Sequence, residues 1–171
     1  MSAKQRKSKK RSDANSDWQR EEPILFLDRN LGKHIIADRL RSAGMKVEVH
    51  DEHLPPDAPD EDWIALVGRM GWVALTKDKN IRYRTAELES IMRNAARVIV
   101  IRARNATGSD IAELLVKGRH RIARFAARTP APFVAAIDRS GIVRAYPNIQ
   151  VSVREPAPVN PGAGGNAGIE S

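Results

Sequence analysis

Three aspartates stand beside apolar runs, at points where proteins of alternating strands and helices bind their ligands. Asp28 directly follows the apolar residues 24–27, and Asp78 comes just after residues 72–76. Short apolar runs that end abruptly in polar residues are typical of buried strands. Asp60 opens an amphipathic stretch that leads into the second of these strands. Because parallel sheets bind ligands beyond the carboxyl ends of their strands, we expect the three carboxylates to meet at one edge.

Carboxylates gathered in this way suit a hard divalent cation, Mg²⁺ or Mn²⁺. Magnesium sites commonly use one or two carboxylates together with waters and substrate phosphate. Such an ion can activate water and stabilise the displaced oxygen in phosphodiester hydrolysis. Each aspartate also has a purely structural interpretation, because Asp28 and Asp78 could begin turns and Asp60 could cap a helix.

A second group of ligand-type side chains is the run His50, Asp51, Glu52 and His53. Histidine with carboxylate can bind Zn²⁺, but four adjacent residues cannot all reach one ion. We therefore expect this group to fix the loop, with Asp51 as a secondary candidate ligand because it follows the strand expected over residues 45–49.

Basic residues surround Asp78, namely Lys77, Lys79, Arg82 and Arg84. A positive rim around an acidic centre would attract a phosphate backbone, so we predict that these four side chains bind a nucleic acid. The alternative is an ordinary solvated surface. That alternative is favoured for the stripe at helical spacing farther along the chain, which consists of Lys117, Arg121, Arg124 and Arg128.

The composition points to the same kind of partner. The net charge is +8 and the isoelectric point is about 10.2 over 171 residues, which makes a polyanion the first partner to consider. No cysteine is present, which excludes disulfides and thiolate metal sites. No apolar run reaches the 18 or so residues of a membrane span, and no apolar segment follows the basic N-terminus as in a secretory signal. We expect a cytoplasmic protein without membrane contact.

The elements that must position these side chains follow from the apolar pattern, which predicts an α/β fold with a mainly parallel sheet. Asp28 or Asn30 is expected to cap the first helix, and Asp60 the second. Residues 50–59, with three prolines, are expected to form a loop. The expected strands are 24–27, 45–49, 72–76 and 97–101, followed by a hairpin of 133–137 with 142–146. The expected helices are 31–43, 60–70, 85–95 and one that runs to 128 after a cap at Thr107 or Ser109. One domain is expected over residues 23–154, between a disordered basic arm (1–22) and a disordered tail (155–171).

Four motifs together resemble those of the PIN-like domain proteins, and within them the VapC-type toxins, over residues 23–137. They are FLDRN at 26–30, HDEH at 50–53, PDEDW at 59–63 and GWVALTKDKNIR at 71–82. The resemblance implies a three-layer α/β/α fold, a site for Mg²⁺ or Mn²⁺ and cleavage of single-stranded RNA, commonly as the toxin of a toxin–antitoxin pair. It assigns Asp28, Asp60 and Asp78 to the acidic centre.

The chain departs from the family pattern at two places. Asn80 stands where many relatives carry an acid, and the glutamate of the wider family has no direct counterpart, so that Glu61 and Asp62 are its nearest substitutes. These three residues, with Asn30 and Asp51, are the secondary site candidates.

We therefore predict a metal-dependent endoribonuclease in which Asp28, Asp60 and Asp78 are catalytic and hold the metal. Two alternatives remain open at this point: a PIN-like module that binds nucleic acid or protein without cleaving, and a nuclease directed at DNA. An antitoxin protein and a homodimer are further partners to be tested.

Overall fold

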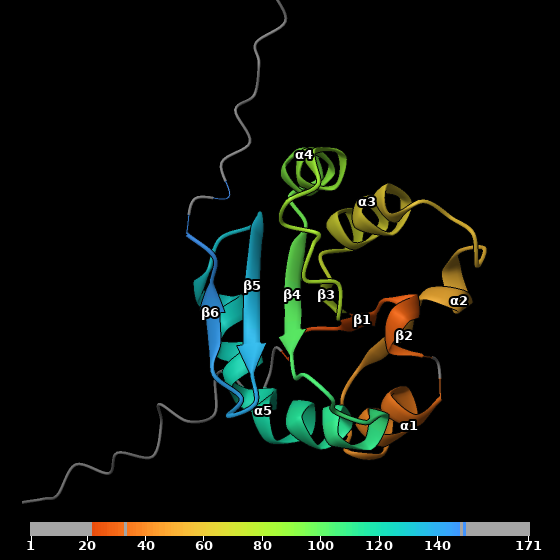
Figure 1. The fold of residues 1–171 in the computed structure, drawn as a ribbon, viewed down its shortest axis with the longest axis vertical. Helices are drawn as coiled ribbons and strands as arrows, with labels where there is room; N and C mark the ends of the chain where they lie inside the picture. Colours follow the sequence, from red (N-terminus) through yellow and green to blue (C-terminus); the bar gives the residue numbers. More distant parts are fainter. Residues whose placement is uncertain (1–21, 33, 148, 150–171) are drawn as a thin grey trace, which may run out of the picture.

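The computed structural model describes residues 22–32, 34–147 and 149, and its centre is a six-stranded sheet in the order β2-β1-β3-β4-β5-β6 (Figure 1). Neighbouring strands run parallel except for β5 and β6, which form an antiparallel hairpin. The strands are β1 (Leu25–Leu27), β2 (Val47–Val49), β3 (Val73–Thr76), β4 (Arg97–Arg102), β5 (Phe133–Asp138) and β6 (Val143–Ala145).

Helices cover both faces of this sheet. Helices α1 and α5 pack on one face, and α3 and α4 pack on the other (Figure 1). The helical elements are η1 (Arg29–Leu31), α1 (Ile35–Ser42), α2 (His50–His53), α3 (Asp60–Met70), α4 (Thr85–Arg93) and α5 (Gly108–Arg128). The predicted three-layer α/β/α class with a mainly parallel sheet is therefore confirmed.

The continuous apolar runs of the strands follow from this double coverage. Successive side chains of a strand point to opposite faces, so a strand that is covered on both sides must be apolar throughout. In β1, Leu25 and Leu27 join the core under α1 and α5, whereas Phe26 joins the core under α3 and α4. The Phe26 ring stacks between Trp63 of α3 and Trp72, at centroid distances of 6.0 and 6.1 Å. This aromatic stack fixes the start of α3 beside the end of β1.

Three local predictions near the site differ from the structure. Neither Asp28 nor Asn30 caps the first long helix, because Asp28 precedes the 3₁₀ turn η1, Asn30 lies within it, and His34 is the residue before α1. Asp60 is the first residue of α3 rather than its cap, and Pro59 precedes it in an extended conformation. The expected loop 50–59 begins with the single helical turn α2. Of the two caps expected for the last helix, the structure uses Thr107, whose hydroxyl accepts from the Asp110 amide at 3.2 Å.

The ends of the chain lie mostly outside the described residues. The expected arm, apart from Glu22, and the expected tail 155–171 fall there. Glu22 itself belongs with the fold, because both of its carboxylate oxygens accept hydrogen bonds from Arg119 of α5, at 2.9 and 2.7 Å. Among the described residues, none of the helices combines the length and the apolar character that crossing a membrane requires.

Candidate active site

Asp28 lies at the carboxyl end of β1, between the ends of β2 and β3. Its side chain is almost fully buried, with 4% of the residue exposed. One oxygen, Oδ2, accepts a hydrogen bond of 2.7 Å from the Thr76 hydroxyl at the end of β3. The other, Oδ1, is buried and has no hydrogen-bond partner among the described residues. A buried carboxylate oxygen without a donor is costly to the fold, and a bound cation is one way to satisfy such an oxygen.

Burial raises the pKa of Asp28 above its ordinary value, because a charged carboxylate loses its hydration there. The Thr76 hydroxyl opposes this rise in pKa, the negative charge of Asp60 adds to it, and His50 opposes it. A carboxyl whose pKa is shifted by burial and by a second carboxylate, at the ligand-binding edge of a sheet, is typical of a functional site.

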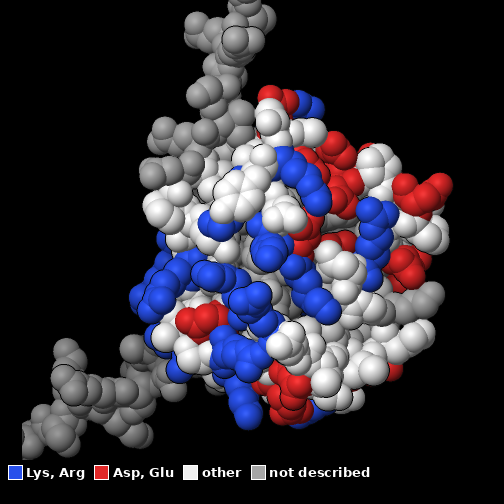
Figure 2. Space-filling view, in the orientation of Figure 1, with Lys and Arg blue, Asp and Glu red and all other residues white. Residues whose placement is uncertain are grey.

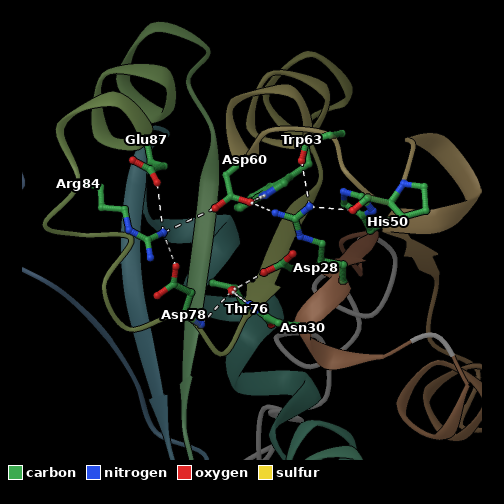
Figure 3. Close-up of polar contacts among 12 residues, drawn as sticks. Asp28, Asn30, His50, Asp60, Trp63, Thr76, Asp78, Arg84 and Glu87 are labelled. Carbon is green, nitrogen blue, oxygen red and sulfur yellow. Dashed lines mark hydrogen bonds and ion pairs between the residues drawn. The ribbon is translucent and has the colours of Figure 1, made fainter.

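Thr76 joins the ends of two strands through one hydroxyl group (Figure 3). The oxygen donates to Asp28 and accepts from the backbone amide of Asp78 at 3.0 Å and from the amide group of Asn30 at 3.1 Å. The Asn30 side-chain oxygen in turn accepts from the Lys77 amide at 3.1 Å. The chain that leaves β3 is thereby held against the chain that leaves β1, and Asp78 is brought to the same edge as Asp28.

Asp60 and Asp78 converge on one cationic side chain, that of Arg84 (Figure 3). The Arg84 Nη1 atom lies 2.7 Å from Asp78 Oδ2 and 3.7 Å from Asp60 Oδ2. Because both oxygens contact the same nitrogen at these distances, they can lie no more than 6.4 Å apart. The same nitrogen also lies 3.2 Å from Oε1 of Glu87, a buried residue in the first turn of α4. Arg84 therefore sits among three carboxylates that come from α3, the β3–α4 loop and α4.

A second arginine, Arg29, binds Asp60 from the other side. Its Nη2 donates to Asp60 Oδ1 at 3.1 Å, and its Nη1 donates to the carbonyls of Pro56 and Ala58. The indole nitrogen of Trp63 donates to the same Asp60 oxygen at 3.2 Å. Asp60 is thus oriented by a turn of its own helix and by the turn that follows β1.

The secondary candidates occupy different surroundings. Asn30 contacts the site through Thr76 and Lys77, and the backbone amide of Asn80 donates to Asp78 Oδ1 at 2.9 Å. Asp51 pairs with His50 at 3.3 Å and lines a separate hollow together with Arg29 and Asn30. Among the described residues, no hydrogen bond or ion pair connects the Glu61 or Asp62 carboxylate with the three aspartates.

The expected loop-fixing role of the run 50–53 agrees with its contacts. Glu52 accepts from Arg41 at 3.0 Å, His53 lies 2.7 Å from Glu48, and His50 is fully buried against the Phe26 ring. In the described part of the chain, Glu48, Glu52 and His53 form a group of three potential metal ligands with atoms within 4.8 Å of one another. Because Arg41 binds Glu52 and His53 contacts Glu48 directly, the group needs no ion to explain its geometry.

The four basic residues expected to bind RNA have different surroundings in the structure. Lys77 and Lys79 are exposed and line an open cleft. The Arg82 guanidinium lies between two aromatic rings, 4.3 Å from the centroid of Tyr83 and 4.5 Å from that of Tyr146. Arg84 is engaged with the acids. Two of the four side chains are thus committed to contacts within the fold.

Sequence reasoning overlooked three residues of the site, namely Arg29, Thr76 and Glu87. A signal existed for Glu87, because the expected helix 85–95 places it in a first turn at position i+3 from Arg84. Thr76 was visible as the polar end of an apolar strand. The contact of Arg29 with Asp60 spans 31 positions and leaves no mark in any local pattern.

Comparison with known proteins agrees with this architecture. Residues 23–103 match the family model described as the PIN-like domain. The chain belongs to the PIN-like domain proteins. It is 32% identical over 124 residues to "Putative ribonuclease VapC45" of Mycobacterium tuberculosis, a match that covers 70% of this chain and 89% of that relative. The similarity places the chain with the VapC-type group, as its motifs predicted. No solved structure matches the chain.

Proposed function

We propose that the chain is a metal-dependent endoribonuclease that cleaves single-stranded RNA. The observation that carries the proposal is the convergence of Asp28, Asp60 and Asp78 at the carboxyl edge of the sheet, around Thr76 and Arg84. The Mycobacterium tuberculosis relative is named as a putative ribonuclease of the VapC group, which supports the same substrate class.

The residues of this site fit a hard divalent cation. The donors are carboxylate oxygens, which Mg²⁺ and Mn²⁺ prefer, and Asp28 Oδ1 is a buried acceptor that lacks a donor in the described structure. Asp28 and Asp78 would hold the ion directly, and Asp60 would complete the site or orient a water. When bound, such an ion activates water and stabilises the leaving oxygen of a phosphodiester.

The protein's own groups contribute orientation and charge balance. Thr76 fixes the Asp28 carboxylate and the Asp78 backbone with one hydroxyl, so a displacement of one would also displace the other. Arg84 lies where a scissile phosphate would approach the aspartates, and its planar guanidinium can change partner from a carboxylate to a phosphate. Pre-positioned groups of this kind lower the cost of reaching the transition state.

The direct test is cleavage of an end-labelled, mixed-sequence single-stranded RNA by the purified full chain, with Mn²⁺ or Mg²⁺ and with EDTA. We expect cleavage that requires the metal and is lost in Asp78→Asn. The matched control is Asp38→Asn, which makes the same chemical change at an exposed position of α1, and it should cleave like the wild type. Equal cleavage by wild type and Asp78→Asn, or cleavage in EDTA, would contradict the proposal.

A second candidate function is a PIN-like module that binds RNA or a protein partner without cleaving. The observation in its favour is Arg84, whose guanidinium already pairs with Asp60, Asp78 and Glu87 where an ion would otherwise bind. Binding of RNA by a clean wild-type protein that leaves the RNA intact in Mn²⁺ would favour this candidate. Faster cleavage of a single-stranded DNA of the same sequence would instead indicate a DNA-directed nuclease.

The cellular setting belongs to the same proposal. The VapC-type similarity supports a cytoplasmic toxin that is restrained by an antitoxin protein, and a homodimer is the assembly to look for first. We also propose that residues 23–154 form the functional domain, between a basic arm and a polar tail. Co-expression with the neighbouring open reading frame, and growth arrest without it, would test the toxin role.

A further inference from the structure

A cleft with basic walls opens at the carboxyl edge of the sheet, next to Asp78. Its volume is about 540 Å³. Lys77 and Lys79 line it from the loop after β3, and Arg102, Arg104 and Asn105 line it from the end of β4 and the following loop. All five side chains are exposed. Figure 2 shows lysines and arginines gathered over the β4–β6 side of the molecule, away from the acids over α3 and α4.

The cleft follows from the unequal lengths of two strands. The last pair between β3 and β4 is Thr76 with Val100, whereas β4 continues to Arg102, which pairs with Asp138 of β5. Two more residues extend β4 beyond β3 by roughly 7 Å. Lys77 and Lys79 flank Asp78 in the chain that turns away from this step. One wall of the cleft is therefore continuous with the loop that presents Asp78.

The basic surface extends past the cleft. A neighbouring hollow of about 360 Å³ shares Ala103 and Asn105 with it and adds Arg139. The Arg139 guanidinium donates to the Arg104 carbonyl, which ties the two loops together. Two carboxylates also lie in this region, Asp110 and Asp138, which accept hydrogen bonds from Thr107 and Ser140 and keep their charge, so the basic side chains of the two hollows outnumber them. The ends of β3, β4 and β5 span roughly 10 Å, which suits a chain of phosphates better than a single anion.

An exposed aromatic side chain in the same loop, outside the lining of the cleft, favours a polyanion that also carries bases. Tyr83, in the loop that carries Lys77 and Lys79, is 67% exposed, and Arg82 lies against its ring. An exposed ring offers stacking only to bases that are unpaired, as in a single strand.

We propose that this cleft, formed by Lys77, Lys79, Arg102, Arg104 and Asn105, binds the sugar–phosphate backbone of a single-stranded nucleic acid beside the aspartates. The proposal adds to the proposed function a binding path for the substrate. It rests on the proposed function only in that the bound strand is then cleaved. Arg102 and Arg104 each contact a phosphate. Lys77 and Lys79 guide the strand toward Asp78.

The test measures binding without cleavage. A fluorescein-labelled 12-nucleotide single-stranded RNA is titrated with the full chain in EDTA, at several salt concentrations, and its anisotropy is followed. The variant is the double substitution Arg102→Gln and Arg104→Gln. The control is Arg124→Gln with Arg128→Gln, which removes the same charge from the exposed stripe of α5, roughly 25 Å along that helix from the cleft.

Loss of two phosphate contacts should raise Kd several-fold and reduce the slope of log Kobs against log salt by about 1.4, while the control keeps the wild-type slope. Arg102→Lys with Arg104→Lys should restore most of the slope. Equal effects of the cleft and control variants would overturn the proposal, because only net charge would then matter. Tighter binding of duplex RNA, or displacement of the RNA by poly-glutamate at lower concentration than by poly-uridylate, would also overturn it.

The experiment distinguishes a failure of the proposed nuclease function from a failure of the cleft proposal. If the cleft variant loses RNA and the wild type never cleaves in Mn²⁺, the cleft is supported and the nuclease is not. If the wild type cleaves and the cleft variant binds and cleaves normally, the nuclease stands and the cleft proposal fails.

Discussion

Replacement of Asp28 by asparagine should stabilise the protein while it removes the activity. In the folded chain Asp28 is buried, its Oδ1 has no donor among the described residues, and burial raises its pKa. Asparagine keeps an oxygen that can accept from Thr76 and removes the charge. Leaving a buried polar group unsatisfied costs about 1–3 kcal/mol, and more if it is charged. The asparagine NH₂ group would replace Oδ1 and stay unpaired, so only the excess cost of the charge is regained, about 1 kcal/mol. For a chain of this size that corresponds to a rise in Tm of about 2–4 °C.

Thermal unfolding with and without Mn²⁺ measures both effects. In EDTA the Asp28→Asn protein should melt above the wild type. In Mn²⁺ at 100 times its Kd the wild type should gain about 2.7 kcal/mol, and the variant should gain much less. The control Asp138→Asn should melt below the wild type and keep the response to Mn²⁺, because the Asp138 carboxylate accepts hydrogen bonds from Ser140 and Ile142 that lower its pKa.

The pH dependence has opposite signs at the two positions. The folded pKa of Asp28 lies above the ordinary value of 3.8, so the folded state carries the cost of a buried charge at neutral pH. The advantage of Asp28→Asn should therefore shrink as pH falls and vanish below about 3.8. The folded pKa of Asp138 is lowered, so its contribution is present above 3.8 and is lost as pH falls through the lowered pKa. If Asp28→Asn melted below the wild type in EDTA at pH 7, or responded to Mn²⁺ as the wild type does, the reasoning would be refuted.

Three other substitutions test neighbouring parts of the site. Arg84→Ala should lower the Mn²⁺ concentration that gives half of the maximal rise in Tm, because the guanidinium no longer competes for Asp60 and Asp78; an unchanged midpoint would mean that the ion binds elsewhere. Thr76→Val keeps the shape of the side chain but removes a hydroxyl with three partners, so urea unfolding should show a loss of about 1–3 kcal/mol, whereas a loss near zero would show that the three contacts do not hold the loops. Tyr83→Ala should weaken single-stranded RNA binding by about 5-fold or more and Tyr83→Trp should not, and equal affinities in an anisotropy titration would exclude stacking.

The sheet and the positions of its strand-end aspartates were readable from the sequence, because both depend on short-range pattern. The continuous apolar run around Phe26 is expected only in a strand that is covered on both faces. The polar residues that follow each such run place Asp28 after β1 and Asp78 after β3. The turn α2 was missed because its four residues are all polar or charged and so show no helical spacing of apolar residues. The cap at Asp60 was misplaced by one residue, since Pro59 takes the extended conformation that precedes the helix.

The ion pairs of the site could not be predicted from the sequence pattern. Long arginine side chains cross from one loop to another, and which carboxylate they reach depends on the final packing of the sheet. Arg84 was therefore predicted as part of an RNA-binding rim, whereas the structure shows it between Asp60, Asp78 and Glu87. The buried state of Glu87 depends likewise on how α4 packs beside α3.

The contacts of Arg29 and Arg84 have a consequence for the order of folding and metal binding. A cluster of carboxylates normally opposes its own assembly, and many metalloproteins cannot fold until an ion arrives. Here two arginines of the same chain supply positive charge at the moment the loops come together. The chain can thus fold without an ion at this site, and under the proposed function Mg²⁺ or Mn²⁺ is needed only for activity.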